Sequence, residues 1–196
     1  MLPFSEACER NKGPILEVLR VAFADRKHVL EIGSGTGQHA VHFAAALSHL
    51  IWQPTEQLKY LSDLGARIKG EGPSNLRPPL LLDVNQSVWP LRSADAVFSA
   101  NTLHIMGWAE VQSMFRGLDT VLSVDGVLCL YGPFRYGGRY TSDSNRDFDR
   151  MLQERDPLSG LRDIDEVSAL AERYRLTLKG DHDLPANNRL LVFVRS

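Results

Sequence analysis

The chain has few cysteines, no long apolar run and no excess of charge of either sign. Its 196 residues include only Cys8 and Cys129, and neither has a second cysteine or a histidine at the spacing of a metal site. We therefore expect reduced thiols and no bound metal. No apolar segment approaches the ~20 residues of a membrane-spanning helix, and residues 1–6 lack a basic region followed by an apolar core. These absences predict a cytoplasmic protein without a membrane partner.

The charge balance also argues against a polyanionic partner. The formal net charge is −2, and the basic residues form no stripe along the sequence. No nucleic-acid partner is expected. The chain is 43% hydrophobic and has no internal repeat or low-complexity tract, so residues 1–196 are predicted to form a single domain around one sizeable core.

A glycine-rich turn lies at residues 29–40. An apolar run that contains Glu31 is followed by Gly33, Gly35 and Gly37 and then by a helix-forming segment. Glycines at these positions permit positive φ angles and the close approach of a ligand to the backbone, and the helix that follows presents free N–H groups. The pattern is typical of a nucleotide-binding turn, although an ordinary strand-to-helix turn gives the same local sequence.

The spacing of the turn helps to identify its ligand. Dinucleotide folds prefer G-x-G-x-x-G, with a pyrophosphate at the helix N-terminus, whereas this chain has G-x-G-x-G. The carboxylate of Glu31 would repel a pyrophosphate and suits the cationic S-adenosylmethionine (SAM). SAM is therefore favoured over NAD as the cofactor, with Gly33 and Gly35 in contact with it.

Acidic residues follow two further predicted strands. Glu56 lies nineteen residues after Gly37 at the tip of the second strand, a position from which a carboxylate can accept hydrogen bonds from both ribose hydroxyls. Asp83 ends the next strand and can accept from an adenine amino group, while the backbone N–H of Val84 donates to a ring nitrogen. Alternatively, Glu56 begins the next helix and Asp83 is a turn residue.

Strands and helices alternate through most of the chain, which predicts an α/β fold with a doubly wound, Rossmann-like parallel sheet. The alternation stops at 132–145, which is rich in aromatic and basic residues and reads as a mobile insertion. A hairpin whose strands are joined by residues 183–188 ends the chain. The strands are expected at 28–32, 50–56, 80–84, 94–101, 127–131, 176–182 and 189–195, and the helices at 14–24, 38–48, 58–70, 108–123, 145–155 and 164–173.

The ordered set resembles the class I SAM-dependent methyltransferases. It is also similar to the narrower family called domain of unknown function 938 (methyltransferase-like), in residues 9–12, 30–40, 52–54, 130–134, 144–145, 156–157 and 185–188. The resemblance implies a seven-stranded sheet in the order 3-2-1-4-5-7-6 with strand 7 antiparallel. It also implies SAM contacted by Glu31, Gly33, Glu56, Asp83 and Val84, with Asn101 near the methionine moiety. Glu56 stands where Asp is more usual.

Methyl transfer needs alignment, exclusion of water and, for some acceptors, removal of a proton. His104 is the candidate base because imidazole titrates near neutrality, although a structural histidine after a strand fits the same sequence. Asn145 and Asn188 are candidate acceptor-orienting amides, or else helix caps and turn residues. Arg10 and Asn11 are expected at the ligand site, as part of a lid or of a solvated helix lead-in.

Two histidines one helical turn apart, His39 and His42, are interpreted as helix-surface residues. Three functions remain open. The first is a methyltransferase that acts on a small molecule, the second a SAM-binding regulator without methyl transfer, and the third a nicotinamide-dependent oxidoreductase. The missing helix-interior glycine and Glu31 weigh against the third.

Overall fold

A seven-stranded sheet organises the computed structural model, which describes residues 2–196. The strand order is β3-β2-β1-β4-β5-β10-β9. The five strands β3 to β5 in this order run parallel, and β10 is antiparallel to both β5 and β9. The predicted order and the antiparallel hairpin are therefore confirmed. The strands are β1 (His28–Ile32), β2 (Ile51–Glu56), β3 (Leu80–Leu81), β4 (Ala94–Ala100), β5 (Leu122–Gly132), β9 (Leu176–Leu184) and β10 (Asn188–Arg195).

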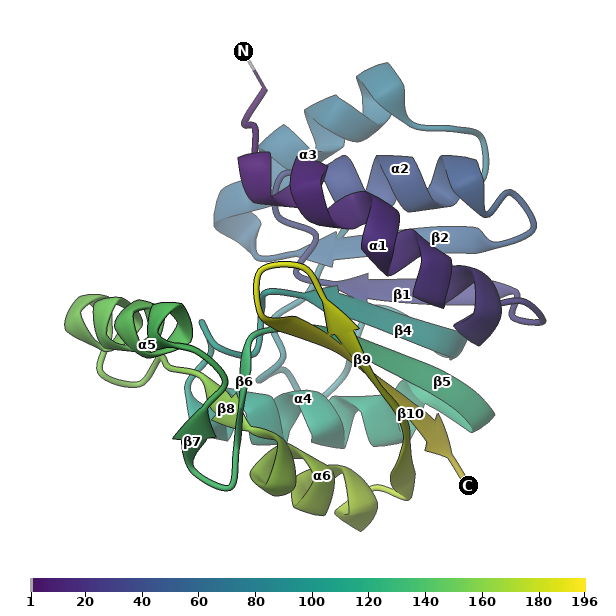
Figure 1. Cartoon of the computed structure of the whole chain (residues 1–196). Helices are drawn as coiled ribbons and strands as arrows, with labels where there is room; N and C mark the ends of the chain where they lie inside the picture. Colours follow the sequence, from purple (N-terminus) through teal and green to yellow (C-terminus); the bar gives the residue numbers. More distant parts are fainter. Residues whose placement is uncertain (1) are drawn as a thin grey trace.

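Helices cover both faces of this sheet, as expected of a doubly wound fold. The first face carries α1 (Glu6–Ala22), α2 (Gln38–Ala46) and α3 (Leu58–Glu71), and the second carries α4 (Trp108–Val121) and α6 (Ile164–Arg173) (Figure 1). Each face buries an apolar cluster. The cluster under α1 to α3 includes Leu19, Phe43 and Trp52, and the cluster under α4 and α6 includes Phe115 and Leu170.

The first helix begins earlier than the sequence predicts. The expected range was 14–24, but α1 starts at Glu6, because the Ser5 side chain caps it by accepting from the N–H of Cys8 at 3.3 Å. Pro14 consequently lies inside the helix. The segment 9–12, which the sequence left open as a lid or a solvated lead-in, forms the second turn of α1.

The second strand passes through Pro54 and ends at Glu56, in agreement with the predicted range 50–56. Trp52 and Glu56 bond backbone groups on the β3 side of β2. Because successive residues alternate, the nitrogen of Pro54 faces that same side. β3 pairs only with Thr55 and Glu56, so the missing N–H of Pro54 breaks no ladder bond there.

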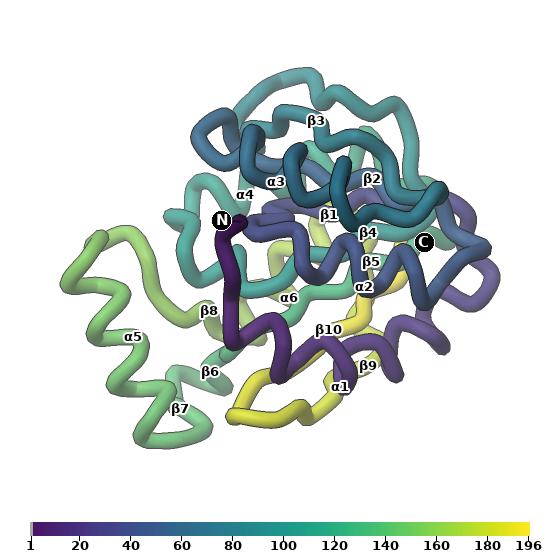
Figure 2. Tube along the Cα trace, turned by 90° about the horizontal axis from the view of Figure 1, so that it is seen from above, coloured from purple at the N-terminus to yellow at the C-terminus, as the bar shows by residue number. Residues whose placement is uncertain are grey.

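The segment after β5 is ordered into a small second sheet. It consists of β6 (Phe134–Tyr136), β7 (Arg139–Tyr140) and β8 (Arg162–Asp163) in the order β7-β6-β8, and α5 (Asp143–Arg155) lies between β7 and β8 in the chain. Figure 2 shows α5 projecting to one side of the sheet. In Figure 1 the parallel strands point toward that side, so the insertion lies near their carboxyl ends. Within residues 2–196, no helix is long and apolar enough to cross a membrane.

Candidate functional site

The glycine turn leads from the end of β1 into α2. Gly33 and Gly35 have φ angles of 73° and 53°, in the left-handed region that favours glycine. A Cβ on Gly33 would lie 2.8 Å from the Thr102 hydroxyl oxygen, so this glycine is also required for packing. A Cβ on Gly35 would meet no atom within 4 Å. The backbone at Gly35 therefore borders open space, as a turn that holds a ligand must.

Glu56 ties this turn to the end of β2. Its Oε2 accepts from the N–H of Gly35 at 2.7 Å, and its Oε1 accepts from the N–H of Gln57 at 2.7 Å. The residue is only 8% exposed. A carboxylate has about four lone-pair sites, so Glu56 can hold the turn and still accept two hydrogen bonds from a ligand.

A cavity of about 720 Å³ lies beside the turn, at the carboxyl ends of β1, β2 and β4. This volume falls within the range of small-molecule sites, ~300–1,000 Å³. Five of the predicted cofactor residues line the cavity: Gly33, Gly35, Glu56, Val84 and Asn101. Other lining residues are Pro3, Ser5, Cys8, Ile32, Ser34, Thr36, His39, Gln57, Lys59, Tyr60, Asp63, Leu82, Ala100, Thr102, Ile105, Met106, Glu110 and Asp156.

Asn101 and the segment after β3 shape the cavity wall. Asn101 has a positive φ of 56°, a conformation that asparagine tolerates better than most residues and that is frequent at functional sites. Val84 faces the cavity, but the side chain of Asp83 is exposed and accepts from the N–H of Asn85 at 2.9 Å. Asp83 thus forms the turn that the sequence left open as an alternative.

Glu31 lies behind the cavity wall. Its Oε2 accepts from the indole N–H of Trp52 at 2.8 Å, and the residue is 2% exposed. Burial raises the pKa of Glu31 to about 7, against the smaller lowering effect of the Trp52 hydrogen bond. A buried carboxyl group that titrates near neutrality gains from a cation placed nearby, so the group suits a cationic ligand electrostatically without touching the cavity.

The predicted N-terminal pair separates in the structure. Arg10 is exposed on α1 and does not line the cavity. Asn11 is buried, and its Oδ1 lies 2.6 Å from Nε2 of His39. His39 is itself only 5% exposed and lines the cavity, so its interpretation as a helix-surface residue is wrong. The reason is tertiary, because α1 packs over the first turn of α2 and covers the ring.

The acceptor-site candidates lie outside the cavity wall. His104 is buried against Phe148, with ring centroids 5.4 Å apart, and burial, with the nearby charge of Arg162, lowers its pKa to about 4. Asn145 donates to Thr141 Oγ1 at 2.9 Å and to the Asn187 carbonyl at 3.0 Å.

Asn188 donates to the carbonyls of Pro185 and Ala186, at 3.2 and 3.4 Å. Asn188 therefore closes the hairpin turn, whereas Asn145 ties the first turn of α5 to that hairpin turn, and neither residue lines the cavity.

Two residues near the site carried no signal in the sequence. Cys8 lines the cavity from α1, and its Sγ lies 4.0 Å from Nδ1 of His39. Arg67 donates to the Thr36 carbonyl at 2.6 Å and to the Pro3 carbonyl at 2.6 Å, which joins the glycine turn to the N-terminal segment. Both depend on long-range packing. Among the described residues, no three His, Cys, Asp or Glu side chains are close enough to hold a metal ion.

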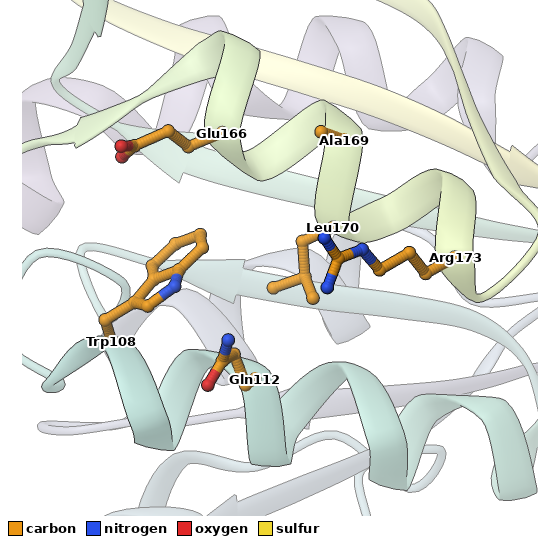
Figure 3. A pocket seen from close by; sticks show the side chains of 6 residues that line it. All are labelled: Trp108, Gln112, Glu166, Ala169, Leu170 and Arg173. Carbon is orange, nitrogen blue, oxygen red and sulfur yellow. The ribbon is translucent and has the colours of Figure 1, made fainter.

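A second, smaller cavity of about 250 Å³ lies between α4 and α6, on the other face of the sheet. Figure 3 shows Trp108 and Gln112 of α4 on one side and Glu166 and Arg173 of α6 on the other. It contains none of the predicted site residues. The larger cavity is therefore the candidate functional site.

Comparison with solved structures gives the same fold. An O-methyltransferase family protein from Burkholderia thailandensis matches with a TM-score of 0.82 at 15% identity, over 94% of this chain and 56% of that one. The mitomycin 7-O-methyltransferase MmcR matches with a TM-score of 0.78 at 19% identity, over 94% and 54%. PigF, solved with S-adenosylhomocysteine (SAH), matches with a TM-score of 0.76 at 13% identity, over 87% and 51%. The chain spans about half the length of these proteins.

A family model covers almost the whole chain. The model described as "Protein of unknown function (DUF938)" matches residues 2–195, and the matched region includes the glycine turn, the complete sheet and the insertion. The chain therefore belongs to the DUF938 family and has the class I methyltransferase fold.

Proposed function

We propose that this protein is a SAM-dependent methyltransferase that acts on a small molecule. The observation that carries the proposal is the joint placement of the glycine turn and the Glu56 carboxylate on one cavity at the carboxyl ends of the parallel strands. Ligands of open α/β sheets bind at this edge. The O-methyltransferases with this fold, and PigF with its bound SAH, support the same assignment.

The residues present fit SAM. The open space at Gly35 lets a ligand approach the backbone, and Glu56 keeps lone pairs free for two ribose hydroxyls. Asn101 and Val84 line the same cavity. Glu31, Asp83, Arg10 and Asn11 do not line the cavity and lie behind or beside its wall. SAM, when bound, supplies an activated methyl group. These residues therefore need only bind SAM, orient it toward the acceptor and exclude water.

The small-molecule acceptor is inferred from the shape and the charge of the site. The cavity is concave and partly apolar, with Ile105 and Met106 beside the glycine turn, which is the usual character of a small-molecule site. The chain carries a formal net charge of −2 and offers no basic stripe for a nucleic acid.

Calorimetric titration with SAM tests the cofactor assignment. Glu56→Ala should weaken SAM binding at least tenfold, because loss of a charged, two-fold acceptor costs about 1.5–3 kcal/mol. Glu56→Gln keeps one acceptor oxygen for the turn, so its SAM affinity should lie between that of Glu56→Ala and that of the wild type. Glu17→Ala is the matched control, since Glu17 is 77% exposed on α1.

Two outcomes would contradict the cofactor assignment. The first is an unchanged SAM affinity in a folded Glu56→Ala variant, and the second is tighter binding of NAD than of SAM. Methyl-labelled SAM incubated with a cell metabolite extract, or with total RNA and protein, decides the acceptor class. Label in macromolecules alone would exclude a small-molecule acceptor, and binding without any transfer would instead indicate a regulator.

A further inference from the structure

We infer that His39 takes the proton from a hydroxyl group of the methyl acceptor, and that Asn11 is the positioning residue for this imidazole. The inference rests on the proposed methyltransferase function. His39 is the histidine that lines the large cavity, whereas His104 does not reach it. Its ring is 5% exposed and stacks on Phe43, with centroids 5.2 Å apart, so its orientation is fixed by packing.

The hydrogen-bond network around Asn11 sets the tautomer of His39. Oδ1 of Asn11 lies 2.6 Å from Nε2 of His39. An amide oxygen can only accept a hydrogen bond, so Nε2 must be the donor in this pair. Nε2 then carries the hydrogen, and Nδ1 keeps its lone pair.

Nδ1 of His39 lies 4.0 Å from the thiol of Cys8, and both residues line the cavity. This contact places the lone pair of Nδ1 on the cavity side of the ring. A thiol is a weak donor, and burial raises the pKa of Cys8, so the thiol stays protonated. A ligand hydroxyl that enters here can therefore replace the thiol as the stronger donor to Nδ1.

The protonation state of His39 agrees with this role. Burial, with smaller contributions from His42 and Lys12, lowers its pKa to about 4, and Glu9 opposes the shift. The imidazole is neutral at physiological pH and ready to accept a proton. A hydroxyl that gains a methyl group becomes a strong acid as the new bond forms, so even this weak base can take its proton. A methylated amine stays a weak acid, which favours hydroxyl acceptors.

The acceptor oxygen forms a bond to the methyl carbon, and the bond from that carbon to the sulfonium sulfur breaks with its electron pair left on sulfur. The O–H bond breaks, and the proton passes to Nδ1 of His39. Asn11 stabilises the resulting imidazolium by accepting from Nε2–H.

Nitrogen-15 NMR of histidine-labelled protein with SAH bound tests the geometry without any turnover. We expect the Nε2–H tautomer at His39 in the wild type. Asn11→Asp should keep this tautomer and raise the His39 pKa, whereas Asn11→Leu should abolish the preference. A wild-type ring with its hydrogen on Nδ1 would overturn the inference.

Transfer of labelled methyl from SAM into a metabolite extract tests the chemistry. We expect ether products, a fall in rate of at least 100-fold in His39→Gln, and SAH affinity within twofold of the wild type. His28→Gln, at an exposed position outside the cavity wall, should keep the wild-type rate. A His39→Gln variant that transfers at the wild-type rate would overturn the inference, as would products methylated on nitrogen alone. Failure of the wild type to bind SAH would instead overturn the proposed function.

Discussion

The two cysteines of this protein lie in contrasting environments. Cys8 is partly exposed and lines the large cavity, whereas Cys129 is fully buried within β5. Burial raises the pKa of both thiols, and more strongly that of Cys129. Because only the thiolate reacts readily, Cys8 should react slowly and Cys129 should not react while the protein is folded. The reactivity of the Cys8 thiol therefore reports on the cavity, and the buried Cys129 thiol serves as the internal control.

We predict that iodoacetamide modifies Cys8 alone in the native protein and that saturating SAH slows this modification at least tenfold, because the ligand fills the cavity. Mass spectrometry of tryptic peptides measures both rates. Cys8→Ser should leave the native protein unmodified. An alkylation rate that is insensitive to SAH would place the ligand away from Cys8.

At the scale of elements, the start of α1 is held to the start of α2. Gln38 Oε1 accepts from the N–H of Ser5 at 2.6 Å, and its Nε2 donates to Glu9 at 2.7 Å. Gln38 is buried. One side chain therefore fixes the turns of α1 that carry Cys8 and Asn11 over the glycine turn, and this placement shapes the cavity wall.

Gln38→Ala should release the N-terminal part of α1. Two partly buried hydrogen bonds are lost, so the free energy of unfolding should fall by about 1–3 kcal/mol, and amide hydrogen exchange should accelerate in residues 5–9. Exchange followed by mass spectrometry measures the local effect. Gln86→Ala, at an exposed position, is the control. Unchanged exchange in residues 5–9 would show that apolar packing alone holds the helix.

At the scale of the whole molecule, three buried groups govern how the free energy of unfolding depends on pH. The pKa values of His39 and His104 fall from 6.5 to about 4 on folding. Between these two pH values the folded protein binds fewer protons than the unfolded chain, so the free energy of unfolding rises with pH. The pKa of Glu31 rises from 4.5 to about 7, so its contribution falls as pH increases through that window. The two histidines together change the free energy of unfolding more steeply than Glu31 does, until the pH is high enough for both to be neutral in the folded and the unfolded protein.

We therefore predict that the free energy of unfolding is greatest near pH 6.5, the ordinary pKa of histidine. Glu31→Gln, which keeps an acceptor for Trp52, should gain stability relative to the wild type as pH rises from 4.5 to 7, by up to about 3 kcal/mol. Urea unfolding at pH 5, 6, 7 and 8 measures both curves. Parallel curves for the two proteins would show that Glu31 does not titrate in this range.

The sequence alone determined the antiparallel hairpin and the glycine turn, because these follow from local periodicity and from glycine spacing. The sheet order came from the resemblance to the class I methyltransferases. It also predicted residues that line the cavity, since Glu56, Val84 and Asn101 follow strands whose carboxyl ends meet at one edge. The predicted start of α1 was less accurate, because Pro14 fits the first turn of a helix but lies inside a helix that Ser5 caps.

Only the tertiary structure decided which polar side chains face the cavity. The sequence predicted His39 on the helix surface, but α1 packs over α2 and buries it. Asn145 links α5 to the hairpin turn, and Asn188 bonds within that turn. These orientations depend on contacts between residues far apart in sequence, such as Asn11 with His39 and Asn145 with Asn187. Local pattern carries no information on such contacts, because burial and hydrogen-bond partners are fixed only when the elements pack together.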